Sequence, residues 1–193
     1  MNPSAPEAGR ARHLALIGGR GCGKSLVTTR LAERYPDFRR LELDALIVAA
    51  AGGRPVAQIV AEEGWPGFRD LEYTVLKTAT ETSDRAFVDC GGGIVVDLDD
   101  AGREIYSERK AEILRSRCRV VYLRCDSDLL AARIKGDPNR PTLSAQESFH
   151  ALMERREDWY SRTAHRVIEA GALASDELAA EIAGWFFEDD PDQ

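Results

Sequence analysis

Gly18-Gly19-Arg20-Gly21-Cys22-Gly23-Lys24-Ser25 lies near the start of the 193-residue chain and matches the pattern G-x-x-x-x-G-K-[ST]. The apolar run 13–17 before it predicts a buried strand, and residues 24–35 predict a helix that stops at Pro36. In this order, the backbone N–H groups of the loop and the positive end of the helix dipole surround one anion. The context therefore favours a phosphate-binding loop over a simple glycine turn.

The loop residues are the candidates for binding a nucleotide and its metal. Lys24 is expected to reach the β- and γ-phosphates of ATP, and the Ser25 hydroxyl is expected to ligate Mg²⁺. We interpret Cys22 as a tolerated small residue and not as a redox centre, because thiol chemistry would block the phosphate position. No N-K-x-D motif for guanine follows a later strand, which argues against a GTPase. The other nucleotide-binding candidates are Gly19, Gly21, Cys22, Gly23 and Leu26.

Strand and helix patterns alternate along the rest of the chain. Further strands are predicted at 40–43, 86–90, 120–123 and 166–168, and an amphipathic helix is predicted at 68–80. Ser144 is expected to cap another helix, and Ser175 the last one. This alternation predicts an α/β fold with a parallel sheet, helices on both faces and ligands at the carboxyl ends of the strands. We expect one domain over 1–193, with a core at 13–170, a C-terminal helix at 175–187 and tails at 1–12 and 188–193.

The composition limits the partners and the location. A net charge of −7 argues against a nucleic-acid-binding surface. No apolar run approaches the roughly 20 residues that span a bilayer, and the first dozen residues lack the apolar segment of a signal peptide. The four cysteines form no C-x-x-C pair and the three histidines stand far apart, so we expect neither disulfides nor a structural zinc. We therefore expect a cytoplasmic monomer that acts on a small molecule.

A second site is predicted after the third strand. Asp89 ends that apolar run and is expected to hold Mg²⁺ through water, as a Walker B acid does. The triplet Gly91-Gly92-Gly93 would let a second ligand approach backbone N–H groups near the γ-phosphate, although a glycine turn with a capping aspartate is the alternative. Asp44 follows the second strand and could accept a proton from an attacking hydroxyl, or could simply cap a helix.

Two arginines are candidates for holding an anionic acceptor. Arg156 falls on the inward stripe of the helix after Ser144, where apolar residues are expected. A cation that faces inward needs an anion, either a ligand carboxylate or phosphate or a structural carboxylate. Arg69, at the start of the predicted helix 68–80, could supply a second guanidinium group to bind the same anion.

A polar segment at about 135–144 is typical of a mobile lid, because it lies between two helices and carries breakers at both ends. Arg140 would move with this lid and could act on the transferring phosphoryl group like an arginine finger. Arg133 lies shortly before the lid and could contact the adenine or the phosphates, with a plain surface residue as the alternative.

Together these residues resemble the shikimate kinase family, a member of the nucleoside monophosphate kinase-like group of P-loop proteins. The resemblance covers about 14–169 and implies a three-layer P-loop kinase fold with a five-stranded parallel sheet in the order 2-3-1-4-5, plus a lid. It implies the phosphorylation of shikimate to shikimate 3-phosphate by ATP with Mg²⁺, in aromatic amino acid biosynthesis. Besides the phosphate loop, it rests on Asp44 with Ile47, Phe68-Arg69 with Glu72, Gly91-Gly92-Gly93, Val120-Val121-Tyr122-Leu123, Arg140-Pro141, and Arg156 with Tyr160 and Ala164.

The resemblance also implies roles for individual residues. The counterpart of Asp44 meets the acceptor hydroxyls and is the proposed base, whereas those of Arg69, Arg156 and Gly92 hold the shikimate carboxylate. The chain departs from the family where Glu42 replaces a usual Asp near the metal, and where the segment 96–107 is longer than the usual connection. Two other functions stay open: a kinase of another hydroxy acid such as gluconate, and a non-catalytic module that senses ATP or shikimate.

Overall fold

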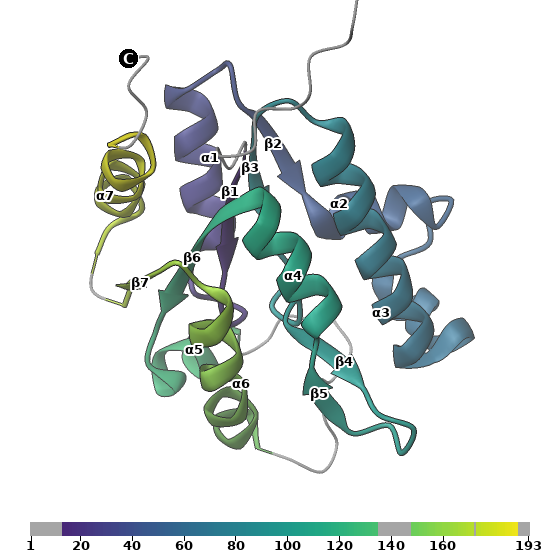
Figure 1. Ribbon diagram of the computed structural model, residues 1–193. Helices are drawn as coiled ribbons and strands as arrows, with labels where there is room; N and C mark the ends of the chain where they lie inside the picture. The colour runs from purple at the N-terminus through teal and green to yellow at the C-terminus, as the bar shows by residue number, and fades with distance from the viewer. Residues whose placement is uncertain (1–12, 135–147, 172, 189–193) are drawn as a thin grey trace, which may run out of the picture.

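Five parallel strands form the main sheet of the computed structural model, which describes residues 13–134, 148–171 and 173–188. Their spatial order is β2-β3-β1-β6-β7 (Figure 1), which is the predicted order 2-3-1-4-5 when only the strands of this sheet are counted. The strands are β1 (His13–Ile17), β2 (Arg39–Glu42), β3 (Ala86–Asp89), β6 (Cys118–Arg124) and β7 (Arg166–Glu169).

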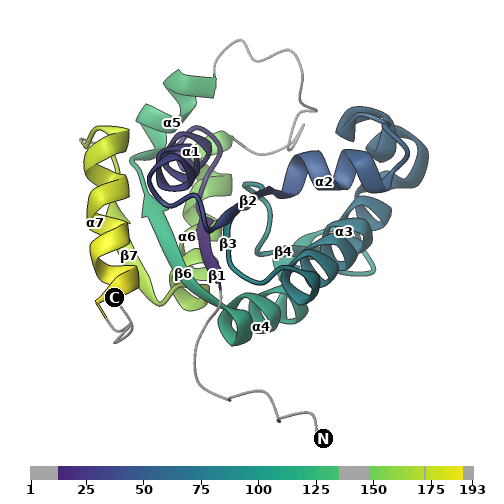
Figure 2. The ribbon, with the colours of Figure 1, turned by 90° about the horizontal axis from the view of Figure 1, so that it is seen from above.

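Helices cover both faces of this sheet, as the alternation predicts. α1 and α7 pack against each other on one face, whereas α3, α4 and α6 lie together on the other side (Figure 2). The helices are α1 (Lys24–Arg34), α2 (Leu43–Ala50), α3 (Val56–Thr82), α4 (Glu108–Arg117), α5 (Ser127–Ile134), α6 (Phe149–Thr163) and α7 (Ser175–Phe187). No helix in these described parts of the chain is long and apolar enough to cross a membrane.

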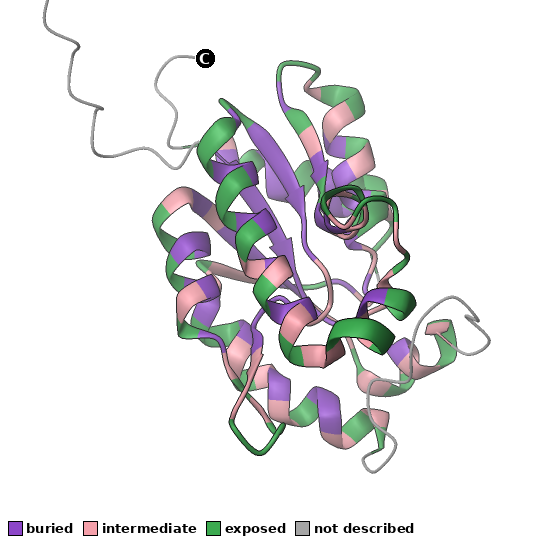
Figure 3. Ribbon diagram, turned by 90° about the vertical axis from the view of Figure 1, so that its right-hand side faces the viewer, coloured by how far each residue is buried: buried purple, intermediate pink, exposed green. Residues whose placement is uncertain are grey.

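The core lies around the central strands of the sheet. Every residue of β1 and β3 is buried (Figure 3), because helices cover both faces and each strand is therefore a nearly continuous apolar run. Phe87 of β3 stacks on Phe38 with ring centroids 4.8 Å apart. Burying one such side chain contributes about 1.5–3 kcal/mol, so this core fixes the strand ends that carry the polar residues.

Two predicted boundaries were wrong in ways that matter for the site. β2 ends at Glu42 and α2 begins at once, so Asp44 lies in the first turn of a helix. The helix predicted at 68–80 begins at Val56 and consists of two segments that meet in a kink at Gly64, whose φ is 71°. Pro66 follows in the first turn of the second segment, where the N–H that proline lacks would have no acceptor within the helix.

One predicted helix cap was wrong, and the other lies outside the described residues. Ser148 is the N-cap of α6, where its hydroxyl accepts a hydrogen bond from the Ala151 N–H at 3.2 Å. Ser175 is the first residue of α7, and the Glu177 carboxylate accepts from the N–H of Ala174. Ser144 and the predicted lid with Arg140 lie outside the described residues.

An antiparallel hairpin of β4 (Val96–Leu98) and β5 (Glu104–Tyr106) was not predicted as secondary structure. Its strands pair Val96 with Tyr106 and Leu98 with Glu104. Each strand has only three residues, which is too short to produce a clear alternation of polar and apolar positions. The hairpin accounts for the long segment 96–107 and lies between α3 and α6 (Figure 1).

Candidate active site

The phosphate loop joins β1 to α1 in a conformation that requires glycine. Gly18, Gly21 and Gly23 have φ values of 139°, 84° and 99°, which side chains rarely tolerate. Lys24 is buried, and its Nζ donates to the carbonyl oxygens of Gly18 and Gly19 at 2.9 Å each. Burial lowers the pKa of Lys24, but the neighbouring Cys22, Tyr160 and Asp89 side chains outweigh it and raise this pKa above its ordinary value. Lys24 is therefore a positively charged side chain that the carbonyls of the loop hold in place.

A cavity of about 310 Å³ lies against this loop, and we call it the nucleotide cavity. Most of the predicted nucleotide-binding residues line it: Gly21, Gly23, Lys24, Ser25, Leu26 and Arg133. Arg133 also donates to the carbonyl of Gly21 at 3.1 Å. Gly19 and Cys22 are buried behind the lining, and Arg140 lies outside the described residues.

The predicted metal ligands Ser25, Glu42 and Asp89 all line the nucleotide cavity. Their donor atoms are oxygens, and one or two carboxylates together with substrate phosphates are the usual environment of Mg²⁺. Arg40 links the two acids, because its Nη1 lies 3.1 Å from Glu42 and its Nη2 lies 3.0 Å from Asp89. The residues fit a magnesium ion that is shared with a nucleotide, and Arg40 is a residue of this site that the motifs did not indicate.

A second cavity, of about 430 Å³, opens beside the first, and we call it the acceptor cavity. Arg20, Glu42, Asp44, Gly91 and Gly92 line both cavities. The predicted acceptor residues Asp44, Arg69, Gly91, Gly92, Gly93 and Arg156 all line the acceptor cavity. The structure thus brings together strand ends and helices that are more than a hundred residues apart in sequence.

Two glycines of the triplet lie so close to polar side chains that a larger residue would have to displace those side chains. A Cβ added to Gly91 would lie 2.9 Å from Oδ1 of Asp44, and one added to Gly93 would lie 2.5 Å from the guanidinium of Arg69. Gly91, Gly92 and Gly93 therefore form a floor along which a ligand can contact the backbone between the carboxylate and the arginines.

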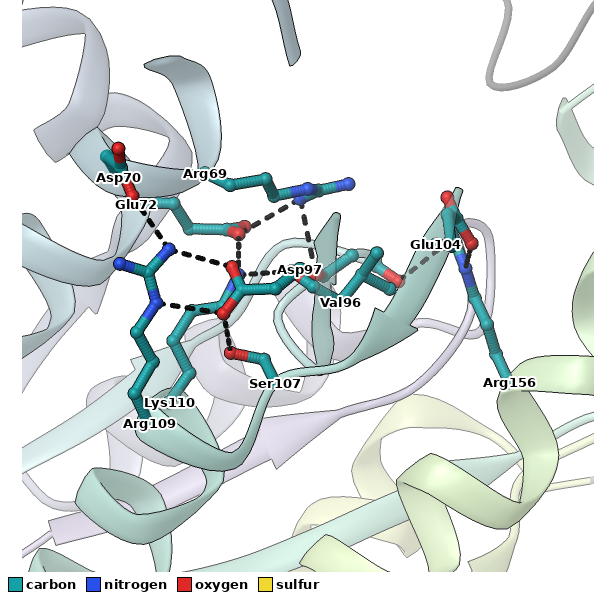
Figure 4. A network of polar contacts seen from close by, with 12 residues as sticks. Arg69, Asp70, Glu72, Val96, Asp97, Glu104, Ser107, Arg109, Lys110 and Arg156 are labelled. Atoms are coloured by element: carbon teal, nitrogen blue, oxygen red, sulfur yellow. Dashed lines mark hydrogen bonds and ion pairs between the residues drawn. The ribbon is translucent and has the colours of Figure 1, made fainter. Parts of the chain in front are cut away.

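Each of the two arginines pairs with one carboxylate (Figure 4) and donates to one carbonyl of the glycine triplet. Arg69 Nη1 donates to Glu72 at 2.9 Å and to the Gly93 carbonyl at 3.2 Å. Arg156 Nε donates to Glu104 at 3.0 Å, and its Nη1 donates to the Gly92 carbonyl at 3.4 Å. The interpretation that Arg156 pairs with a structural carboxylate is confirmed. Its binding of a ligand anion stays a prediction, with which its position in the lining of the acceptor cavity is compatible.

Arg69 keeps a donor that its protein partners do not use. Its side chain is buried, and its guanidinium carbon lies 5.4 Å from the ring centre of Trp65 and 5.3 Å from that of Phe68. Within the described part of the chain, its Nε has no hydrogen-bond acceptor. A buried unsatisfied donor costs about 1–3 kcal/mol, so the protein alone does not fully satisfy the guanidinium of Arg69.

A chain of buried charges supports Arg69 from behind. Lys110, which is fully buried, donates to Glu72 at 2.7 Å and lies 3.5 Å from Asp97 of β4. Burial raises the pKa of Glu72, but the charges of Lys110 and Arg69 outweigh it and leave this pKa below its ordinary value. Burial lowers the pKa of Lys110, and the attraction of Glu72 offsets only part of that effect. The chain of charges ends at Arg109, which contacts both Asp97 and Asp70 (Figure 4).

We predict that Asp97→Asn destabilises the protein by about 2 kcal/mol at pH 7, the scale of hydrogen bonds to charged groups. Burial raises the pKa of Asp97, but its bonds from Arg109 and Ser107 and the charge of Lys110 outweigh this and lower it. The stabilisation is therefore complete above the unfolded pKa of about 3.9 and is lost as pH falls through the lower folded value. Urea unfolding at several pH values should show the difference from wild type shrinking below about pH 4. A difference that stays constant, or an equal effect of Asp100→Asn at an exposed position of the same hairpin, would contradict the assignment.

Several residues of the acceptor cavity were not predicted as site residues. Trp65, Phe68, Val48, Val56 and Phe149 supply apolar walls. Phe149 and Met153 lie on α6 before Arg156 and line the same cavity. The inward-facing apolar stripe in the sequence could therefore have indicated these two residues. Glu104 and Lys110 do not line the cavity but contact Arg156 and Glu72 behind it. No signal indicated them, because a charged residue in a polar segment is usually exposed.

The geometry defines a class of protein. Asp44, Gly91 and Gly92 lie where the nucleotide cavity meets the acceptor cavity, so a phosphoryl group bound on the loop would face an acceptor bound between the arginines. This is the arrangement of a P-loop kinase with a small anionic acceptor.

Comparison with known proteins specifies the family. The family model described as shikimate kinase matches residues 20–186. A shikimate kinase of Leptospira biflexa is 36% identical over 173 residues, which are 90% of this chain and 94% of that protein. Shikimate kinase 2 of Sodalis glossinidius is 33% identical over 175 residues, covering 88% of this chain and 92% of that one. The chain belongs to the shikimate kinase family, and ATP and Mg²⁺ are its cofactors.

Solved structures agree with this assignment. Shikimate kinase from Acinetobacter baumannii in complex with shikimate has a TM-score of 0.78 and 27% identity, covering 93% of this chain and 95% of that chain. Shikimate kinase from Aquifex aeolicus has a TM-score of 0.73 and 25% identity, covering 91% of this chain and 96% of that chain. The implied fold and strand order are therefore confirmed.

Proposed function

We propose that this chain transfers the γ-phosphoryl group of ATP to a hydroxyl of shikimate, with the nucleotide and acceptor cavities as the two halves of its active site. Membership of the shikimate kinase family supports the reaction. The single structural observation that carries the proposal is the shared lining, in which Asp44, Gly91 and Gly92 belong to both cavities. A hydroxyl bound there would lie beside a carboxylate and next to the phosphate loop.

In this proposal Asp44 accepts the proton of the acceptor hydroxyl as the new O–P bond forms. Its carboxylate is half-buried in the first turn of α2 and close to Gly91. Lys24 and the backbone of residues 18–23 bind the phosphates, and Ser25, Glu42 and Asp89 would hold Mg²⁺, which neutralises phosphate charge when it is bound. Arg140 and Arg133 remain proposed contacts of the nucleotide, and the position of Arg140 lies outside the described residues.

The acceptor cavity matches the chemistry of shikimate, a small ring with hydroxyls and one carboxylate. Arg69 and Arg156 supply guanidinium donors for the carboxylate, and each charge-assisted hydrogen bond is worth about 1.5–3 kcal/mol. The apolar walls from Val48, Trp65 and Phe68 suit the carbon ring. The cavity therefore favours a compact hydroxy acid over an uncharged alcohol.

We predict ATP- and Mg²⁺-dependent phosphorylation of shikimate in an assay that couples ADP formation to NADH oxidation, with little turnover of gluconate or of shikimate methyl ester. The ester keeps the hydroxyls but lacks the charge that the arginines bind, so it is a matched control for the carboxylate. Turnover of gluconate without turnover of shikimate would show that the acceptor is another hydroxy acid and not shikimate. Tight binding of shikimate and ATP with no turnover of any acid would indicate a sensing module.

We further infer that residues 1–193 form one kinase domain that acts as a cytoplasmic monomer without nucleic acid. The net charge of −7 supports the absence of a nucleic-acid partner, because nucleic-acid surfaces need clusters of positive charge. Light scattering during gel filtration, with and without shikimate and ATP, measures the oligomeric state directly.

A further inference from the structure

The β4–β5 hairpin brings a carboxylate to the arginine of α6 that lines the acceptor cavity. Glu104 of β5 accepts hydrogen bonds from both Nε and Nη2 of Arg156, and another at 2.8 Å from Arg155 (Figure 4 shows the pair with Arg156). Only 2% of the Arg156 side chain is exposed. Two parallel bonds of this kind fix both the position and the plane of a guanidinium.

Glu104 approaches Arg156 without entering the acceptor cavity. Arg156 lines that cavity of about 430 Å³, whereas Glu104 is absent from its lining and instead borders a separate cavity of about 80 Å³. The Nε–Nη2 edge of the guanidinium is thus occupied by the hairpin. Nη1 lies on the other side, toward the Gly92 carbonyl and the glycine floor of the acceptor cavity.

The same arrangement occurs at Arg69, whose carboxylate partner is Glu72 and whose carbonyl partner is Gly93. Each arginine is therefore held by an acid and by a carbonyl of the glycine triplet, and Arg156 also contacts Tyr160, whose hydroxyl donates to the same Gly92 carbonyl. An arginine side chain has several rotatable bonds, and holding it in one conformation before a ligand binds removes an entropy cost from binding. These partners indicate that both guanidinium groups are already oriented before a ligand binds.

We propose that Glu104 is a positioning residue for the acceptor, which holds Arg156 in the orientation that binds the acceptor carboxylate. This inference rests on the proposed function, in which Arg156 binds that carboxylate. It also assigns a function to the long segment 96–107, whose hairpin would stabilise the acceptor cavity from outside. Glu104 would not touch the acceptor and would act only through Arg156.

The test is steady-state kinetics of Glu104→Gln with shikimate and ATP as the varied substrates. Glutamine keeps the shape but loses the charge and one acceptor oxygen, so the KM for shikimate should rise about 10-fold, the effect of losing one charge-assisted bond. The kcat and the KM for ATP should change by less than about 2-fold, because neither depends on the orientation of Arg156. Arg103→Ala, at an exposed position of the same hairpin, is the matched control and should leave all three values unchanged.

Arg156→Ala and the double variant separate this inference from the proposed function. Arg156→Ala should raise the KM for shikimate more than that for ATP; equal effects on both, or no effect, would remove Arg156 from the acceptor site and the proposed function would need revision. If Arg156→Ala behaves as expected, adding Glu104→Gln to it should change the KM by less than about 2-fold, because the acid then has nothing to orient.

Two outcomes would overturn the role of Glu104 while the proposed function survives. An unchanged KM for shikimate in Glu104→Gln would show that Arg156 needs no support. A lowered KM would show that Glu104 competes with the acceptor carboxylate for the same guanidinium. If thermal unfolding shows that Glu104→Gln does not fold, Glu104→Asp keeps the charge with a shorter reach, and its KM for shikimate should also rise.

Discussion

Asp44→Asn should lower kcat by about 10² to 10⁴, the range for loss of a general base, while the KM for ATP stays nearly unchanged. Asparagine has the same shape but cannot accept the proton of an attacking hydroxyl. Asp44 borders both cavities and lies close to Gly91, so an isosteric side chain should leave the glycine floor in place. Initial rates with either substrate varied, at saturating levels of the other, measure both quantities.

Asp37→Asn is the matched control, because Asp37 is exposed in the turn before β2 and borders neither cavity. It should retain the rate of the wild-type protein. A large rise in the KM for ATP or Mg²⁺ in Asp44→Asn would instead place Asp44 with the metal. A kcat within about 3-fold of wild type would exclude proton transfer by Asp44 as a major part of catalysis.

The sequence predicted the parts of the active site that follow from local pattern. The phosphate loop could be recognised because its glycines and Lys24 stand between a strand and a helix, and both elements were placed within one residue. Arg156 could be predicted to face inward because its neighbours on α6 form an apolar stripe. The resemblance to the family supplied the strand order, which local pattern alone does not determine.

The support behind the arginines could not be predicted, because it depends on contacts between distant segments. Glu104 meets Arg156 only after a hairpin of three-residue strands brings it to a partner 52 residues away in sequence. Lys110 stands among charged residues at the start of α4, yet it is fully buried against Glu72. Sequence pattern predicts such residues to be exposed, because buried charges are rare unless they are paired, and the partners become visible only in the fold.

Lys24→Met should lower kcat/KM for ATP by about 10³ while shikimate still binds, because the variant loses a cation that stabilises charge on the transferring phosphoryl group. Lys24 borders the nucleotide cavity but not the acceptor cavity, so the arginines that bind the carboxylate should be unaffected. Methionine is similar in length and can fill the buried position below Gly18 and Gly19. Coupled kinetics measure the loss for ATP, and calorimetric titration measures the binding of shikimate.

Lys77→Met makes the same substitution at an exposed position of α3 and should retain wild-type kinetics. Because the pKa of Lys24 is raised, the wild-type lysine stays protonated through neutral and moderately alkaline pH. The loss caused by Lys24→Met should therefore be the same at pH 7 and pH 9, whereas a lysine acting as a base would give a loss that grows with pH. Retention of full kcat/KM for ATP in Lys24→Met would mean that the loop binds phosphate through its backbone alone, and a parallel loss of shikimate binding would mean that the two cavities are not separate.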